Sequence, residues 1–135
     1  SIDPSVVNLL DSTSFIPVIA PIGIGDDYKT YNINADIVAG KIAKILQAGK
    51  YVMLTNTAGV FDDDGNLIKS MNAEQVRQFV KKGTITSGML PKVESALEAV
   101  SAGVHNVQII DGTIEHALLL ELFTDEGVGT MIRRT

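Results

Sequence analysis

Residues 34–57, NADIVAGKIAKILQAGKYVMLTNT, place an amphipathic helix directly before an apolar strand. In the first part of this stretch the apolar residues recur at helical spacing, at Ile37, Val38, Ile42, Ile45 and Leu46. Asn34 is a favourable N-cap and Gly49 is typical of a helix end, so we expect a helix from Asn34 to about Ala48. Residues 51–57 are apolar without alternation, which indicates a strand buried on both faces of a sheet.

The alternation of helix and strand continues along the rest of the chain. Further helices are expected from Asp3-Pro4, over 72–82, over 91–102 and from about 113 to Phe123. Further strands are expected at 15–22, 106–110 and 127–134, with a hairpin turn at Asp64-Gly65. These elements predict an α/β fold with a mainly parallel sheet sandwiched between helices. Because ligands of such sheets bind beyond the carboxyl ends of the strands, the loops 21–34, 55–62 and 111–113 are candidate sites.

The composition indicates a single globular domain. The chain has 135 residues, of which 45% are hydrophobic, and this is enough to bury a core. Its net charge of −5 argues against a nucleic-acid partner, because such a surface needs a basic footprint. No apolar run approaches the roughly 18 residues of a membrane span, and the first residues lack a signal-peptide pattern. We therefore expect a soluble cytoplasmic domain that contacts neither nucleic acid nor membrane.

Lys92 occupies an unusual place for a lysine. Pro91 suits the first position of a helix, so Lys92 falls in the first turn. Unpaired amides already give that turn about half a unit of positive charge. One interpretation is a side chain that simply points into water, and the other is an anion site in which the amides and the ammonium bind a phosphate together. The residues alone leave both interpretations open.

Residues 54–60, LTNTAGV, leave the predicted strand as small and polar side chains. This stretch is either an ordinary strand exit or a loop that holds part of a nucleotide. The chain has neither the phosphate-loop motif GxxxxGK[ST] nor a GxGxxG that opens a helix, which disfavours the standard P-loop and dinucleotide folds. The acidic run 62–64 lacks the remaining ligand positions of a calcium loop, so no metal site is predicted there.

Several longer motifs follow one another along the chain. They are YNINAD (31–36), VMLTNTAGVFDDDGNLI (52–68), TSGMLPKVESALEAVSAGV (86–104), VQIIDG (107–112) and HALLLELFTDEGVGTMI (116–132). In this order they resemble the amino-acid kinase family over essentially the whole chain. Within that family they are most similar to the acetylglutamate kinases, which phosphorylate the side-chain carboxylate of N-acetyl-L-glutamate in arginine biosynthesis. The resemblance implies an amino-acid kinase or carbamate kinase-like fold, with residues 1–135 as its C-terminal lobe, a single ATP-binding domain.

The resemblance also implies the residues that act in catalysis and binding. Lys92 would neutralise charge on the transferring phosphoryl group, and Asp36 would hold it in position. Asn32 and Asn34 would bind the acyl amino-acid substrate. ATP with Mg²⁺ would be bound by two segments, Thr55, Asn56, Thr57, Ala58, Gly59, Val60 and Phe61, and Thr84, Ile85 and Thr86. One departure from the family pattern is Asn56, where many relatives carry an aspartate.

Other implications concern regulation and the rest of the enzyme. The C-terminal motif is similar to that of arginine-inhibited members, which makes Glu121 and Gly129 candidates for an arginine effector site. The N-terminal half, with the substrate and dimerisation regions, would be absent from this chain. The full enzyme would then be a homo-oligomer, and this fragment would be inactive alone.

Two alternatives remain open. The chain could belong to another amino-acid kinase, such as an aminoadipate-derivative kinase, an aspartokinase or a uridylate kinase, because the substrate pocket of the family lies largely in the other half. It could also be a non-catalytic fragment that binds ATP or arginine without turning either over.

Overall fold

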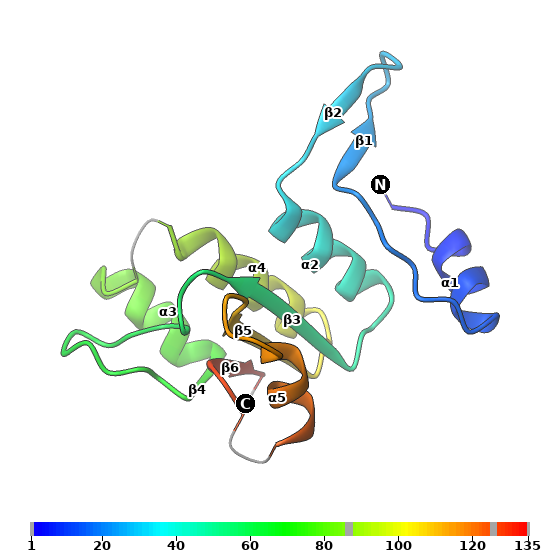
Figure 1. Cartoon of the computed structure of the whole chain (residues 1–135). Coiled ribbons are helices and arrows are strands. Elements are labelled where there is room, and N and C mark those ends of the chain that lie inside the picture. Colours follow the sequence, from blue (N-terminus) through cyan, green and yellow to red (C-terminus); the bar gives the residue numbers. More distant parts are fainter. Residues whose placement is uncertain (1, 86–87, 125–126, 135) are drawn as a thin grey trace.

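The computed structural model describes residues 2–85, 88–124 and 127–134. Helices and strands alternate along much of this chain (Figure 1). The helices are α1 (Ser5–Ser12), α2 (Ala35–Ile45), α3 (Ala73–Lys82), α4 (Leu90–Ser101) and α5 (Ala117–Phe123). The strands are β1 (Ile22–Ile24), β2 (Thr30–Asn32), β3 (Lys50–Thr55), β4 (Ser70–Asn72), β5 (Asn106–Asp111) and β6 (Thr130–Arg133). None of the helices described is both long enough and apolar enough to cross a lipid bilayer.

The main sheet has the strand order β3-β5-β6-β4. Strands β3 and β5 run parallel, with Tyr51 opposite Val107 and Thr55 opposite Asp111. Strands β4 and β6 are also parallel to each other, whereas the central neighbours β5 and β6 are antiparallel. The sheet is therefore mainly parallel, as the sequence predicts. Strands β1 and β2 form a separate antiparallel hairpin that projects away from this sheet (Figure 1).

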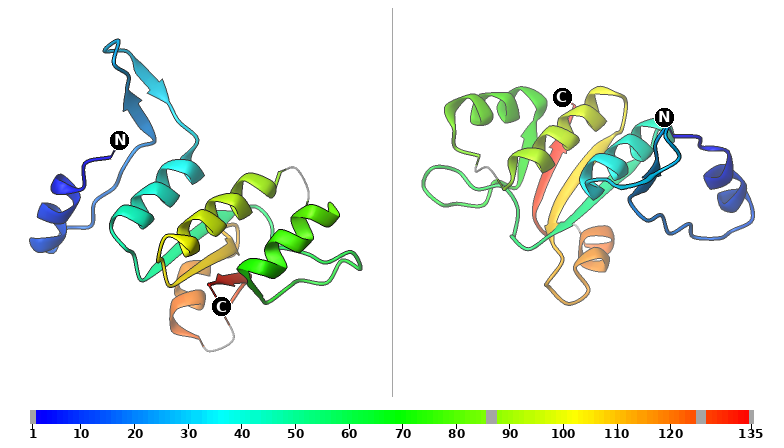
Figure 2. Two further views of the ribbon diagram at one scale, coloured as in Figure 1. Left: turned by 180° about the vertical axis from the view of Figure 1, so that it is seen from behind. Right: turned by 90° about the horizontal axis from the view of Figure 1, so that it is seen from above.

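Helices cover both faces of the main sheet. Helices α2, α3 and α4 lie on one face and α5 lies on the other, which confirms the predicted sandwich (Figure 2). The largest part of the core lies under the three helices, where Val93 and Val100 of α4 meet Val107 and Ile109 of β5 and Ile132 of β6. Each of these side chains is fully buried. Val107 and Ile109 are two residues apart on β5, so the pleat of the strand turns both toward this layer.

Side-chain caps define where α2 and α3 begin. The Oδ1 atom of Asn34 accepts a hydrogen bond from the backbone N–H of Asp36 at 2.9 Å, which supplies a partner for one of the free amides of the first turn. Asn72 caps α3 in a reciprocal capping box, and Gly83 ends that helix with a φ of 82°. The predicted starts of α2 and α3 are confirmed, although α2 ends at Ile45 and not near residue 48.

The predicted buried strand at 15–22 is wrong. Strand pairing begins only at Ile22, and the residues before it are exposed coil, with Ile16 and Val18 at 91% and 95% exposure. The prolines of the segment cannot donate hydrogen bonds to a neighbouring strand. Within the described residues, no strand lies beside the segment to form hydrogen bonds with its remaining backbone N–H and C=O groups. An apolar, β-branched run becomes a buried strand only where a neighbour pairs with it.

Two smaller differences have local causes. Strand β4 was not expected, because it has three residues, the last of which, Asn72, is also the cap of α3, and because in the part of the chain that the structure describes it pairs with the distant β6. Helix α5 begins at Ala117 and not near residue 113. Before it, Asp111 accepts hydrogen bonds from the N–H and hydroxyl of Thr113, and His116 has a left-handed φ of 58°. These turn conformations are not helical, so the helix begins only after them.

Helices α2 and α4 are in close contact at Gly40. A Cβ atom at this buried position would collide with the Ser95 hydroxyl oxygen. That hydroxyl is already engaged, because it donates a hydrogen bond of 2.9 Å to the backbone carbonyl of Asp36. Gly40 is therefore needed for the close approach of the two helices.

We expect Gly40→Ala to lower the free energy of unfolding by about 1–3 kcal/mol, because the added methyl group must displace Ser95 or separate the helices. Alanine's better helix propensity, about 1 kcal/mol, opposes this loss only partly. Gly49→Ala is the matched control, since a Cβ there has no heavy atom within 4 Å. Urea unfolding of both variants tests the prediction, and equal stabilities for the two would contradict it.

Candidate functional site

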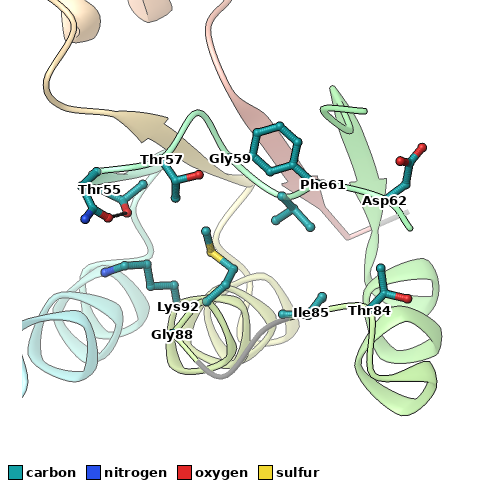
Figure 3. A pocket seen from close by; sticks show the side chains of 12 residues that line it. Thr55, Thr57, Gly59, Phe61, Asp62, Thr84, Ile85, Gly88 and Lys92 are labelled. Atoms are coloured by element: carbon teal, nitrogen blue, oxygen red, sulfur yellow. Dashed lines mark hydrogen bonds between the residues drawn. The ribbon is translucent and has the colours of Figure 1, made fainter. Parts of the chain in front are cut away.

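A cavity of about 400 Å³ lies at the carboxyl end of β3. It lies between the loop of residues 56–62, residues 84–85 and the start of α4 (Figure 3). The lining residues are Thr55, Asn56, Thr57, Gly59, Val60, Phe61, Asp62, Thr84, Ile85, Gly88, Met89 and Lys92. We call this cavity the strand-end pocket. Its position is the one at which α/β sheets commonly bind ligands.

An ion pair between Lys92 and Asp36 lies beside this pocket. Lys92 extends from the first turn of α4 toward the strand end that carries Thr55 (Figure 3). Its Nζ atom is 2.8 Å from Oδ2 of Asp36, in the first turn of α2. The side chains are 21% and 22% exposed, so the pair is shielded from water more than a surface ion pair. The structure therefore brings a cation to the pocket wall and holds it there through a carboxylate.

The surroundings of Lys92 favour a negatively charged ligand. Among the described residues, no side chain caps the start of α4. Gly88 and Met89, which directly precede this helix, line the pocket. The positive end of the α4 dipole therefore adds to the charge of the Lys92 ammonium. The carboxylate of Asp36 partly balances this positive charge. A phosphate group is a suitable ligand for such a combination of helix terminus and ammonium.

Two buried side chains hold the backbone of Asp36 in place. The Ser95 hydroxyl and the Tyr51 phenol both donate to the Asp36 carbonyl oxygen, at 2.9 Å and 3.2 Å. Burial raises the pKa of the Tyr51 phenol above its usual value, and the nearby Asp36 carboxylate acts in the same direction. The phenol therefore stays protonated and able to donate. Asp36 is thus held through its carbonyl, while its carboxylate is directed to Lys92.

Most of the residues expected to bind a nucleotide line one pocket. They are Thr55, Asn56, Thr57, Gly59, Val60, Phe61, Thr84 and Ile85, and the expected catalytic residue Lys92 lines the same pocket. Ala58 belongs to the same loop but does not line the cavity, and Thr86 lies outside the described residues. Asp36 reaches the site through its ion pair with Lys92. The structure therefore brings together segments that are far apart in the sequence.

The two asparagines expected to bind substrate do not line this pocket. Asn34 is the cap of α2, with its side-chain oxygen bonded to backbone N–H groups. Asn32 is the last residue of β2 and is exposed on the hairpin. Their binding of substrate remains a prediction, and the structure assigns Asn34 a capping role that is compatible with it.

Three lining residues were not among the expected site residues: Asp62, Gly88 and Met89. Asp62 accepts hydrogen bonds from the backbone N–H groups of Asp64 and Asn66, so it shapes the hairpin as well as facing the pocket. The pKa of the Asp62 carboxyl is below its usual value, and the hydrogen bond from the Asn66 N–H contributes most to this lowering. Gly88 and Met89 directly precede the helix that carries Lys92, and this adjacency was the available signal.

A second cavity, which we call the polar pocket, contains both residues expected to bind an effector. Its volume is about 460 Å³, and Glu121 and Gly129 line it together with Lys50 and Asn106. The Glu121 side chain is only 5% exposed and lies 3.5 Å from the Lys50 ammonium. Its carboxylate also accepts a hydrogen bond of 2.9 Å from the Val128 N–H. The polar pocket thus holds a buried carboxylate at the amino end of β3, opposite the strand-end pocket.

Residues 2–111 match the amino acid kinase family. The acetylglutamate kinase of Azoarcus sp. (strain BH72) is 59% identical over 133 residues, which are 98% of this chain and 44% of that protein. The acetylglutamate kinase of Nitrosococcus oceani is 57% identical over 132 residues, again 98% of this chain and 44% of that protein. The chain therefore spans less than half the length of these curated relatives.

Solved structures show the same fold. The N-acetylglutamate synthase from Neisseria gonorrhoeae, complexed with coenzyme A and L-arginine, has a TM-score of 0.93 at 31% identity. The match covers 100% of this chain and 31% of that one. Giardia carbamate kinase has a TM-score of 0.76 at 18% identity, over 97% of this chain and 47% of its own, and supports the fold alone. The expectation of a carbamate kinase-like fold is confirmed.

Tyr51→Phe tests how strongly the phenol supports Asp36. We expect it to lower the free energy of unfolding by about 1 kcal/mol near pH 8, because the Asp36 carbonyl loses one donor. The folded-state pKa of Tyr51 is raised, so its contribution is present below the unfolded-state pKa of 10.0 and is lost as pH rises toward the folded-state value. The difference in the free energy of unfolding between wild type and Tyr51→Phe, which we call the gap, should therefore narrow above about pH 10.

Urea unfolding of both proteins at pH 8 and in the alkaline range measures this gap. All other ionisable groups are common to both proteins, so the difference isolates Tyr51. A gap that widened with rising pH would show that the ionised phenol is the favoured form and would contradict the assignment.

Proposed function

The chain belongs to the amino acid kinase family, and on that premise we propose that it is the C-terminal, nucleotide-binding half of an acetylglutamate kinase. The full protein would transfer the γ-phosphoryl group of ATP to the side-chain carboxylate of N-acetyl-L-glutamate, a step of arginine biosynthesis. The Lys92–Asp36 pair beside the strand-end pocket is the observation that carries this proposal. The 59% identity to an acetylglutamate kinase supports the choice of substrate.

Phosphoryl transfer suits a site of this kind. The reaction needs little covalent chemistry from the protein, and catalysis comes from positioning and from stabilising negative charge. Lys92 would place its ammonium against the oxygens of the transferring group, over which negative charge is spread in the transition state. Asp36 would keep that ammonium on the pocket wall, and Tyr51 and Ser95 would hold Asp36. The N-terminus of α4 would add its positive dipole.

The strand-end pocket has a donor set that fits a nucleotide. Thr55 and Thr57 offer hydroxyl groups, Asn56 offers an amide, and Gly59 adds backbone to the lining. Bound with ATP, magnesium would neutralise part of the phosphate charge. Within residues 2–85, 88–124 and 127–134, no group of three or more His, Cys, Asp or Glu side chains could hold a metal ion.

The polar pocket supports a second proposal, that it binds arginine as an effector. The Glu121 carboxylate suits a guanidinium or ammonium group. Among the described residues, Asn106 Oδ1 is buried with no hydrogen-bond partner and could accept another donor. The structurally similar synthase from Neisseria gonorrhoeae was solved with L-arginine. Gly129 lines the pocket, and a Cβ atom there would collide with the backbone carbonyl of Ile109, so β5 requires a glycine at this position.

Two alternatives differ from this proposal in what the chain would do. Another amino-acid kinase would phosphorylate a different acceptor, and a panel of acyl amino acids, aspartate and nucleoside monophosphates on the full-length protein separates these cases. A non-catalytic fragment would bind ATP or arginine without turnover. We propose that the 135-residue chain by itself behaves in this second way, because it covers only 44% of the matched kinases.

Lys92→Ala in a full-length version of the protein should reduce kcat at least about 100-fold, because it removes a group that stabilises the transition state. The KM for MgATP should change only several-fold, since other groups in the pocket hold the rest of the nucleotide. Lys81→Ala is the control, because Lys81 is an exposed lysine at the end of α3. Turnover that survived the loss of Lys92 would remove the main support for the proposed chemistry.

Asp36→Asn separates capping from catalysis. The substitution leaves the Asn34 cap intact and keeps the size of the side chain, but it removes the carboxylate that holds Lys92. We expect kcat of the full-length protein to fall at least about tenfold while the helix content stays unchanged. Circular dichroism and steady-state kinetics measure the two effects. Full activity would mean that Asp36 serves only the start of α2.

Calorimetry of the 135-residue chain tests the two pockets separately. Wild-type protein should bind MgATP and, independently, L-arginine. Glu121→Gln should weaken arginine binding at least about tenfold while leaving MgATP affinity unchanged, because a charged hydrogen bond is lost in one pocket only. Glu115→Gln is the control, since the Glu115 side chain is 89% exposed. Arginine affinity that is equal in all three proteins would exclude the polar pocket as its site.

A further inference from the structure

Thr130 is a fully buried polar residue in β6 that contacts the loop of the strand-end pocket. Its hydroxyl oxygen accepts a hydrogen bond of 2.8 Å from the backbone N–H of Val60. The same hydroxyl donates a bond of 2.7 Å to the carbonyl oxygen of Ile68. The Ile68 N–H in turn donates to the Val60 carbonyl at 2.9 Å. A single side chain therefore joins the outgoing and returning sides of the 60–68 hairpin to β6.

The geometry requires a hydroxyl at this position. A hydroxyl group can accept one hydrogen bond and donate another at the same time, and valine, which has the same shape, can do neither. Gly59 is packed against this hydroxyl, because a Cβ atom at Gly59 would lie 2.5 Å from Thr130 Oγ1. Gly59 also has a φ of 147°, which side chains rarely allow. Two successive residues of the loop, Gly59 and Val60, thus contact Thr130.

Both of those residues, Gly59 and Val60, line the strand-end pocket, whereas Thr130 does not. We propose that Thr130 is a positioning residue for nucleotide binding, a role that rests on the proposed function of that pocket. It fixes the backbone of Gly59 and Val60, and through them it sets the shape of the wall that meets the nucleotide.

Nucleotide affinity distinguishes positioning from a merely structural role. Thr130→Val keeps the shape of the side chain but removes both hydrogen bonds, so we expect MgATP affinity of the 135-residue chain to fall about tenfold. Thr130→Ser keeps the hydroxyl and loses a buried methyl group, so stability should fall while MgATP affinity stays within about twofold of wild type. Ile132→Val is the matched control, because Ile132 is fully buried in the same strand and does not line the pocket.

Calorimetry with MgATP and urea unfolding are to be measured for all four proteins. The positioning role predicts that only Thr130→Val loses affinity, although Thr130→Ser and Ile132→Val also lose stability. Affinity that follows stability across the series, or equal affinity in wild type and Thr130→Val, overturns the inference and leaves the proposed function intact. Absence of MgATP binding in wild type itself overturns the proposed function and the inference with it.

If Thr130→Val shows no cooperative unfolding, amide hydrogen exchange of Thr130→Ser decides the question. The hydroxyl of serine should keep the Val60 amide as slowly exchanging as in wild type, at unchanged MgATP affinity. Fast exchange at Val60 with unchanged affinity would show that the hydrogen bond does not matter for binding and would overturn the inference.

Discussion

The ion pair between Lys92 and Asp36 is the contact on which the arrangement of the strand-end pocket depends. Each residue lies in the first turn of a helix, so each stands in the positive field of a helix N-terminus. That field stabilises the carboxylate of Asp36 and destabilises the ammonium of Lys92. In the ion pair, the carboxylate that the field stabilises offsets the unfavourable position of the ammonium. Gly40 permits close contact between α2 and α4, the two helices that carry the pair. The pocket thus owes its charge to the packing of two helices.

The carbonyl of Asp36 extends this dependence into the core. Tyr51 comes from β3 and Ser95 from α4, so the orientation of one aspartate relies on the sheet and on the neighbouring helix. Such a residue is held on both its backbone and its side chain, which limits how far the Lys92 ammonium can move. A preorganised charge of this kind loses little entropy when an anion binds. The rigidity of the site is therefore a property of the layer between α2, α4 and β3.

Much of the fold could be predicted from the sequence wherever a structure depends on residues that are close together in the chain. Asn34, Asn72 and Gly83 mark helix ends because caps act over a few neighbouring residues. The run 15–22 could not be placed, because its apolar composition says nothing about whether a partner strand lies beside it. Asp62 likewise had the sequence pattern of a solvated turn, and only the folded hairpin shows that it also faces a cavity. The structure of both segments depends on residues that are distant in the sequence. A single sequence does not show which distant residues come into contact.

Strand β6 has two sides that serve different cavities. Gly129 and Met131 line the polar pocket, while the intervening Thr130 points to the loop that lines the other pocket. The alternation of a strand therefore places two ligand environments on opposite faces of one short backbone segment. Energetic linkage between two sites is mutual. If a ligand in the polar pocket shifts β6 and thereby changes nucleotide affinity by some factor, the nucleotide must change the affinity of that ligand by the same factor.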